Sequence, residues 1–191
     1  VYSGGVIEGD ALGGAPDIEL SGKIRGNIRT GGANVNITGE VGKNATIFAG
    51  TIRFTRSSVV NGNVSVYGSR IELDGTVRGN VIAKGREITL GGEFFGNVEV
   101  NSTNFGKPHP RSERRDAKLT VLPGTIIHGT LKFRGGNADI QSGARITNFE
   151  WDKTGSNEQR WTFASYAWKF FRFVFTTIAY LLLASLLFKA F

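Results

Sequence analysis

Two histidines, His109 and His128, are the candidates for acid–base chemistry in this sequence. The chain has no cysteine, so a thiolate metal site and a disulfide framework are both excluded. Two histidines do not make a three-ligand zinc site unless carboxylates join them, and no spacing here indicates one. We therefore expect His109 in a loop and His128 at a turn, both structural. We predict neither an enzyme nor a bound cofactor or metal.

A polar stretch over residues 101–117 is the first candidate contact site. Its four basic residues of interest are Lys107, Arg111, Arg114 and Arg115. Clustered cationic side chains suit a phosphate, a lipid head group or an acidic partner. A solvated loop is the competing interpretation, because Glu113 and Asp116 offset part of the charge.

The C-terminal stretch holds the second candidate contact site. Five aromatic and basic residues precede an apolar run: Trp161, Tyr166, Trp168, Lys169 and Arg172. Residues 173–188 carry no charge. A helix over residues 166–188 would reach ~34 Å at ~1.5 Å per residue, enough to cross a ~30 Å hydrocarbon core. The sequence therefore predicts one transmembrane helix within residues 161–191, anchored at the membrane interface by these five residues. A buried amphipathic helix is disfavoured because the run is apolar on all faces.

The elements that must position these residues follow from a repeat of 17 residues. Residues 20–30 (LSGKIRGNIRT), 73–83 (LDGTVRGNVIA) and 90–100 (LGGEFFGNVEV) share their apolar and glycine positions. Apolar residues alternate at a spacing of two, which is typical of short strands. We ascribe the recurring glycines, and the asparagines that follow them, to turns that need positive φ. One period then predicts one coil of a parallel β-helix, with about seven coils in all.

Four interior ladders of stacked side chains follow from this alignment. They are Ile7, Ile24, Val41, Val60, Val77 and Phe94; Ala11, Ile28, Ile47, Val64, Val81 and Val98; Ile18, Val35, Ile52, Ile71 and Ile88; and Leu20, Ile37, Phe54, Leu73 and Leu90. Between residues 37 and 73 the register slips by two residues, which we assign to loops around residues 43–44 and 55–58.

The predicted organisation has three parts. The β-helix occupies residues 1–146, with residues 101–117 as an insertion at one corner. Residues 147–160 form a cap and linker, and residues 161–191 form the helix. The sequence has no methionine and opens at Val1, which fits removal of a secretory signal, and Phe191 need not be the natural end.

The ladder pattern I-x-L-x-G-x-V-x-G-x-V on a 17-residue coil resembles the bactofilins, the polymer-forming bacterial cytoskeletal proteins. The resemblance covers residues 3–146, and residues 119–124 (LTVLPG) and 129–131 (GTL) resemble the last coils of a membrane-attached subset. It implies a right-handed β-helix on the periplasmic side of the bacterial cytoplasmic membrane. The charges around the helix, taken alone, favour a cytoplasmic β-helix, because Lys189 alone follows the apolar run.

These observations predict a non-enzymatic, membrane-anchored scaffold. We expect an accessory or stabilising subunit docked on a larger membrane complex, with membrane lipid and other membrane protein subunits as partners and with no nucleic acid or small-molecule substrate. A self-polymerising envelope scaffold is the alternative, although residues 149–161 would cover one end. A hexapeptide-type acyltransferase is a weaker alternative, because its aliphatic residues repeat every six positions, unlike the intervals of four, seven and six between residues 77, 81, 88 and 94.

Overall fold

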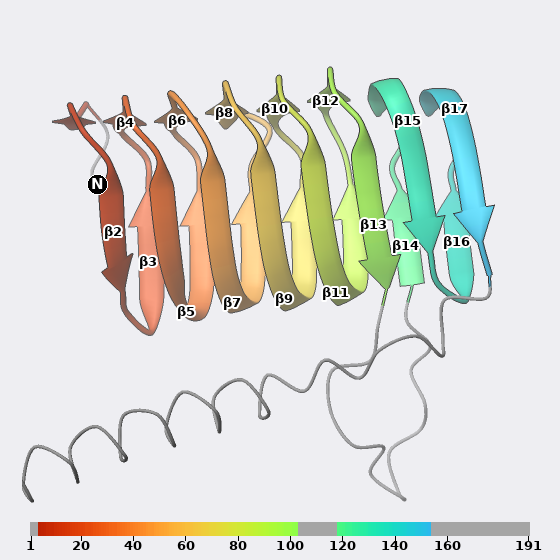
Figure 1. The fold of residues 1–191 in the computed structure, drawn as a ribbon, viewed down its shortest axis with the longest axis horizontal. Coiled ribbons are helices and arrows are strands. Elements are labelled where there is room, and N and C mark those ends of the chain that lie inside the picture. Colours follow the sequence, from red (N-terminus) through yellow and green to blue (C-terminus); the bar gives the residue numbers. More distant parts are fainter. Residues whose placement is uncertain (1–3, 103–117, 154–191) are drawn as a thin grey trace, which may run out of the picture. The chain divides into compact units, whose positions relative to one another are not determined.

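A parallel β-solenoid is the architecture of this chain. The structure is a computed structural model, and it describes residues 4–102 and 118–153. Seventeen strands pair in parallel into one sheet that winds around a single hydrophobic core (Figure 1). The nearer strands, such as β2 (Ala11–Gly14), run down the view, and the more distant ones, such as β3 (Asp17–Leu20), run up (Figure 1). Because the chain advances from left to right, the coil is right-handed.

Each of the first six turns of the solenoid begins with a short strand. The six two-residue strands are β1 (Val6–Ile7), β4 (Lys23–Ile24), β6 (Glu40–Val41), β8 (Val59–Val60), β10 (Thr76–Val77) and β12 (Glu93–Phe94). Four strands of ten residues bend around a corner: β5 (Ile28–Ile37), β7 (Ala45–Phe54), β9 (Val64–Leu73) and β11 (Val81–Leu90). The later turns contain β13 (Val98–Ser102), β14 (Lys118–Val121), β15 (Ile126–Arg134), β16 (Asn137–Ile140) and β17 (Arg145–Asp152).

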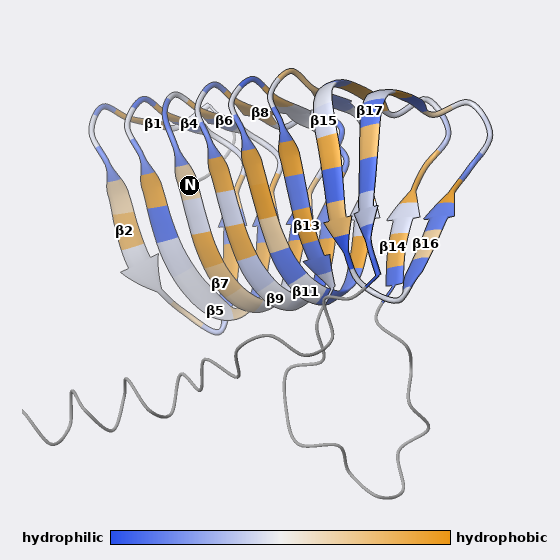
Figure 2. Cartoon of the chain, turned by 45° about the vertical axis from the view of Figure 1, so that its right-hand side comes forward, coloured by the Kyte–Doolittle hydropathy of each residue, from blue (hydrophilic) through white to orange (hydrophobic). Residues whose placement is uncertain are grey.

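The core consists of side-chain columns that run through successive turns. The predicted ladders that begin at Ile7, Ile18 and Leu20 are confirmed rung by rung. Figure 2 shows the alternation of hydrophobic and hydrophilic residues along the strands that produces these columns. The ladder assigned to Ile47 is wrong, because Ile28 pairs with Ala45. Ile47 belongs to the neighbouring interior column, between Thr30 and Val66.

The register slip has one site and not two. Two residues separate most long strands from the next short strand, but four residues, 55–58, separate β7 from β8. Pairing shows no slip at residues 43–44. Corners of four residues recur at 122–125 and 141–144. We call these three segments the wide corners.

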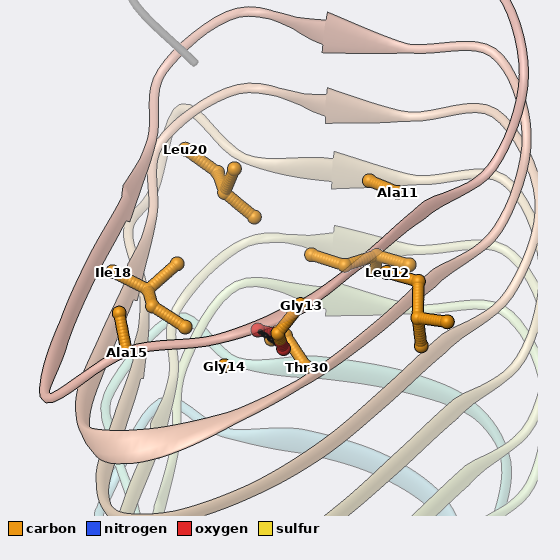
Figure 3. A pocket seen from close by; sticks show the side chains of 9 residues that line it. Ala11, Leu12, Gly13, Gly14, Ala15, Ile18, Leu20 and Thr30 are labelled. Carbon is orange, nitrogen blue, oxygen red and sulfur yellow. Dashed lines mark hydrogen bonds between the residues drawn. The ribbon is translucent and has the colours of Figure 1, made fainter.

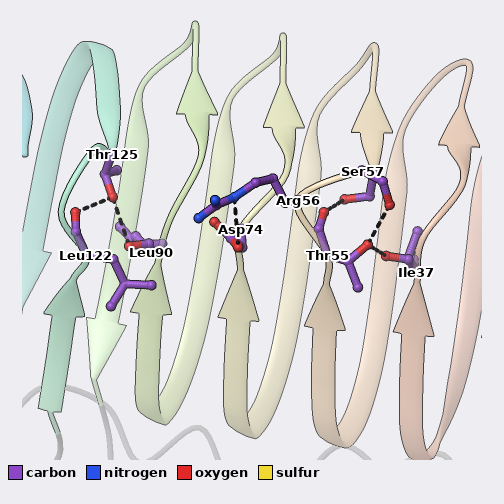
Figure 4. A network of polar contacts seen from close by, with 9 residues as sticks. Ile37, Thr55, Arg56, Ser57, Asp74, Leu90, Leu122 and Thr125 are labelled. Carbon is purple, nitrogen blue, oxygen red and sulfur yellow. Dashed lines mark hydrogen bonds and ion pairs between the residues drawn. The ribbon is translucent and has the colours of Figure 1, made fainter.

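A buried hydroxyl closes two of the wide corners. Ser58 donates a hydrogen bond to the carbonyl of Thr55 at 2.7 Å, and Thr125 donates to the carbonyl of Leu122 at the same distance. Thr125 also contacts the carbonyl of Leu90 in the preceding turn at 3.1 Å (Figure 4). Both hydroxyl residues are at most 1% exposed, so these bonds satisfy groups that water cannot reach.

Close stacking, and not positive φ, explains most of the repeated glycines. A Cβ on Gly79 would lie 2.6 Å from the carbonyl oxygen of Gly62, and a Cβ on Gly96 would lie 2.5 Å from that of Gly79. Among the described glycines, positive φ is confined to Gly4, Gly92, Gly124 and Gly143. The turn explanation was therefore wrong for the main glycine column.

The asparagines after these glycines link one turn to the next. The side-chain oxygen of Asn63 accepts a hydrogen bond from the backbone N–H of Asn80 at 2.8 Å, and Asn80 accepts one from Asn97 at 2.9 Å. The same ladder starts at Asp10, whose carboxylate accepts from the N–H of Asn27 at 2.7 Å. The asparagines therefore lock the register between turns.

The predicted fold class is corrected in two respects. The solenoid has about eight turns and not about seven, because β17 continues the stack on β15. The other correction concerns the helix: residues 4–102 and 118–153 contain no helix, and so none that is long and apolar enough to span a membrane. The predicted transmembrane helix of residues 161–191 lies outside the described residues.

Candidate interaction surfaces

The residues predicted as contact sites all fall outside the described ranges. They are Lys107, Arg111, Arg114 and Arg115 for an anionic partner or lipid, and Trp161, Tyr166, Trp168, Lys169 and Arg172 for the membrane interface. His109 also lies outside. These predictions are therefore untested, and the candidate sites below come from other residues.

His128 lies in β15 and contacts the preceding turn. Its Nε2 is 2.8 Å from Oε1 of Glu93, and its ring stacks on Phe95 with 4.8 Å between centroids. The side chains of His128 and Glu93 remain 47% and 39% exposed. Within the described residues no group of three or more His, Cys, Asp or Glu side chains is placed to hold a metal. The contacts of His128 join neighbouring turns.

A shallow groove of about 330 Å³ lies over the two-residue corners at 74–75 and 91–92, which are flanked by two of the wide corners. The wide corners at 55–58 and 122–125 form its sides, and Gly75 and Gly92 lie between them. Arg56 and Asp74 pair across one side, with 3.5 Å between Nε and Oδ2 (Figure 4). The charged groups along the groove already have partners on the protein, which leaves little to bind a ligand.

The N-terminal end of the solenoid is hollow. An apolar cavity of about 280 Å³ opens there, with Ile18 and Leu20 on one wall and Ala11 across from them (Figure 3). The hollow exists because Ala11 and Gly13 occupy interior positions that Ile28 and Thr30 fill in the next turn. Too little side-chain volume is present to close the core at this end.

The first turn of the solenoid is rich in carboxylates. Residues 4–22 contain Glu8, Asp10, Asp17 and Glu19 and no lysine or arginine. Hydrogen bonds from the backbone and side chain of Asn27 hold the pKa of Asp10 below its ordinary value, and Arg29 lowers it further. Asp10 is therefore charged at neutral pH, and Glu8 and Asp10 form ion pairs with Arg25 and Arg29 of the second turn.

The C-terminal end of the solenoid carries aromatic rings. Phe149 and Trp151 on β17 are 39% and 38% exposed, and Ile140 on β16 is 40% exposed. The ring centroid of Trp151 is 6.2 Å from that of Phe149 and 6.0 Å from that of Phe133. Its Nε1 donates a hydrogen bond to the carbonyl of Gly135 at 3.1 Å, which holds the indole in place.

The two ends are matched column by column. Phe149 ends the column that starts at Ala11, and Trp151 ends the column that starts at Gly13. The smallest interior residues at one end therefore correspond to the largest at the other. Most of the exposed large apolar side chains in the described ranges belong to these end turns: Val6, Leu12, Ile140, Phe149 and Trp151.

The exposed large apolar residues away from the ends are Phe48 and Phe95. Phe95 covers His128, whereas Phe48 stacks on Tyr67 with 4.7 Å between ring centroids. Phe48 was not among the residues predicted from the sequence. Alignment of the repeat could have found it, because Phe48 and Tyr67 occupy an outward position that Lys84 holds in the next turn.

No protein-family model matches this sequence, and neither the curated proteins nor the solved structures contain a significant match.

Proposed function

We propose that this protein is a non-enzymatic structural scaffold that assembles end to end through its solenoid. The observation that carries the proposal is the match between the hollow above Ala11 and Gly13 and the rings of Phe149 and Trp151. The resemblance of the ladder pattern to that of the bactofilins, which form polymers, also supports the proposal. Location at a membrane stays a prediction from residues outside the described ranges.

Stacking one copy on the next would continue every interior column. Pairing β17 of one copy in register with β1 and β2 of another sets Phe149 against Ala11 and Trp151 against Gly13. The rings would then enter the hollow and leave water. Complete burial of a large apolar side chain contributes about 1.5–3 kcal/mol, and Phe149 and Trp151 would contribute the part of this that corresponds to their exposed 39% and 38%.

Backbone groups at the ends support the same arrangement. Among the described strands, β1, β2 and β3 pair only with the second turn, and β16 and β17 pair only with the turn before them. Such edges carry N–H and C=O groups that another strand can bind. Parallel pairing across the joint would repeat the pairing found inside the solenoid.

Charges at the joint are mixed. Arg145 would lie opposite Val6 and beside Glu8, where opposite charges attract. Asp139 would lie opposite Glu19, where like charges repel, although Lys118 binds Asp139 at 3.0 Å and reduces the repulsion. The apolar and backbone contacts therefore provide the attraction, and the charges modify it.

A second candidate is an accessory subunit docked on a larger complex. The apolar hollow favours it, because a partner segment with one bulky apolar side chain would fill the hollow. This candidate uses one end of the solenoid and predicts a fixed ratio to another protein.

Purification of the full chain in mild detergent, followed by sedimentation and electron microscopy over a range of concentrations, separates these functions. End-to-end assembly predicts rods that lengthen with concentration and that Trp151→Ser shortens. Phe95→Ser is the matched control, since Phe95 is exposed but lies away from the ends. A fixed ratio to another protein supports the accessory subunit. Particles of constant length that Trp151→Ser does not change contradict end-to-end assembly.

A further inference from the structure

One flank of the solenoid carries a raised pair of rings beside a strip with no side chains. Four outward positions form a column across β2, β5, β7 and β9: Gly14, Gly31, Phe48 and Tyr67. The rings of Phe48 and Tyr67 are nearly parallel, at 8°. Phe48 is 57% exposed. Its ring contacts Tyr67 on one face, and the next rung on the other side is Gly31.

The two rings, Phe48 and Tyr67, and the two glycines, Gly14 and Gly31, cover equal lengths of the column. Rungs lie ~4.8 Å apart, so two rings and two glycines each cover ~9.6 Å of the column. A Cβ on Gly31 would lie 3.1 Å from the carbonyl oxygen of Phe48 and 3.9 Å from its Cβ, and one on Gly14 would lie 3.3 Å from the carbonyl oxygen of Gly31. The glycine strip therefore carries no side chain over the same length of the column that the two rings occupy.

This half of the flank is also poor in charge. The outward positions in the first four turns are Leu12, Arg29, Thr46 and Ser65 in one column and Gly14, Gly31, Phe48 and Tyr67 in the other. One of these eight is charged, Arg29, and it pairs with Asp10 at 3.8 Å.

The same columns in the last four turns are strongly charged. They hold Ile82, Glu99, Lys132 and Glu150, and Lys84, Asn101, Arg134 and Asp152. Six of these eight are charged, and Arg134 and Lys132 form ion pairs with their neighbours. A charged ladder suits solvent, whereas a patch with few charges and exposed rings is typical of an interface.

We propose that this flank binds the same flank of a second copy, with the two solenoids antiparallel about a two-fold axis between Gly31 and Phe48. The axis places Phe48 of each copy on Gly31 of the other, and Tyr67 of each copy on Gly14 of the other. Two sheets packed face to face lie ~10 Å apart, a gap that aromatic side chains fill.

A second copy fits better than an unrelated partner because the column is complementary to its own reverse. Read in opposite directions, two glycines followed by two rings match two rings followed by two glycines at every rung. An isologous contact requires this property, and a contact with another protein does not. Leu12, which is 84% exposed on the same flank, adds apolar area at the edge of the contact. The proposal concerns the flank and stands whether or not the ends assemble.

The proposal can be tested in the full chain with substitutions that change which positions of this column carry an aromatic ring. Gly14→Tyr fills the strip, and Tyr67→Gly removes one ring, so each single variant should weaken pairing by roughly tenfold or more. The double variant Gly14→Tyr with Tyr67→Gly restores a complementary column and should recover pairing. Sedimentation velocity measures association, and circular dichroism checks that each variant is folded. Loss in both single variants without recovery in the double variant overturns the two-fold arrangement.

Cross-linking separates the flank from the ends, because the natural chain has no cysteine. One chain carrying Gly14→Cys and another carrying Tyr67→Cys are mixed and oxidised. Flank pairing predicts a disulfide between the two chains, and it should persist when both also carry Trp151→Ser. End-to-end stacking brings the first turn against the last and cannot join these positions. Absence of the cross-link in a mixture that still associates overturns the proposal.

Discussion

Trp151 and Gly13 lie at opposite ends of one interior column. The column passes through Thr30, Ile47, Val66, Ala83, Val100 and Phe133, and it pairs at every step. It therefore begins with no side chain and ends with the largest one. Because every turn repeats the same path, this difference in volume leaves a cavity at one end and a protruding ring at the other.

Filling the hollow should block assembly without harming the fold. In Gly13→Trp the new ring would occupy the cavity of its own chain, where a Cβ meets nothing within 4 Å. We expect shorter rods in electron micrographs and an unfolding free energy that is unchanged or higher. Phe95→Trp is the control, because Phe95 is exposed but lies away from the ends. Rods of normal length in Gly13→Trp would contradict the end-to-end arrangement.

Gly92→Ala should destabilise the solenoid by about 1–3 kcal/mol. Gly92 has a φ of 72°, and an added Cβ would press on the carbonyl of Gly75 and lie 2.9 Å from the carbonyl carbon of Asp74. Gly136→Ala is the matched control, since nothing lies within 4 Å of its Cβ position and its φ is not positive. Urea unfolding measures both variants. Equal midpoints would show that the corner adapts to a side chain.

Thr125→Val should cost about 1–3 kcal/mol, because it removes a buried hydroxyl and keeps the shape of the side chain. The change leaves the carbonyls of Leu122 and Leu90 without this donor inside the wide corner. Thr89→Val, on an outward position of β11, is the control and should change the unfolding free energy little. A stable Thr125→Val protein would mean that another donor replaces the hydroxyl.

Asp10 should make stability depend on pH in the acid range. Its pKa in the folded chain lies below the ordinary value of 3.8, so the unfolded chain binds a proton first as the pH falls. The stabilisation is complete above that value and is lost as the pH drops through the folded pKa. Glu40, whose pKa is lowered by Lys23 and Asn61, acts in the same direction below 4.5.

Asp10→Asn isolates this contribution. The variant keeps a side-chain oxygen for the ladder to Asn27 but cannot titrate. We expect its unfolding free energy to fall less than that of the natural chain below about pH 4, while the difference between them stays constant near neutral pH. Urea unfolding at a series of pH values measures both curves. Parallel curves down to pH 2 would show that Asp10 does not contribute.

The last turn shows why the number of turns was underestimated. Up to Phe94 the repeat reads regularly apart from the wide corner at residues 55–58, because the other turns use the same spacing between their strands. From β14 onward wide corners add two residues, and the pairing of β15 with β17 shifts register between Ile127 and Thr130. Such changes keep the interior columns in space but break their spacing in the sequence.

The period of 17 residues and most interior columns could be read from the sequence, because stacking places equivalent residues in identical surroundings. The cause of the glycines could not, since a close backbone approach and a positive φ select the same residue. The exposed surfaces could not be predicted from the sequence either. Gly13 and Trp151 lie at the two ends of one column, and Phe48 stacks on Tyr67, only because the coil superposes residues that are distant in the chain. Alternation along a strand is a local property, so it could be predicted from the sequence. The identity of the last side chain in each column, and the surface that it leaves exposed, depend on the whole stack.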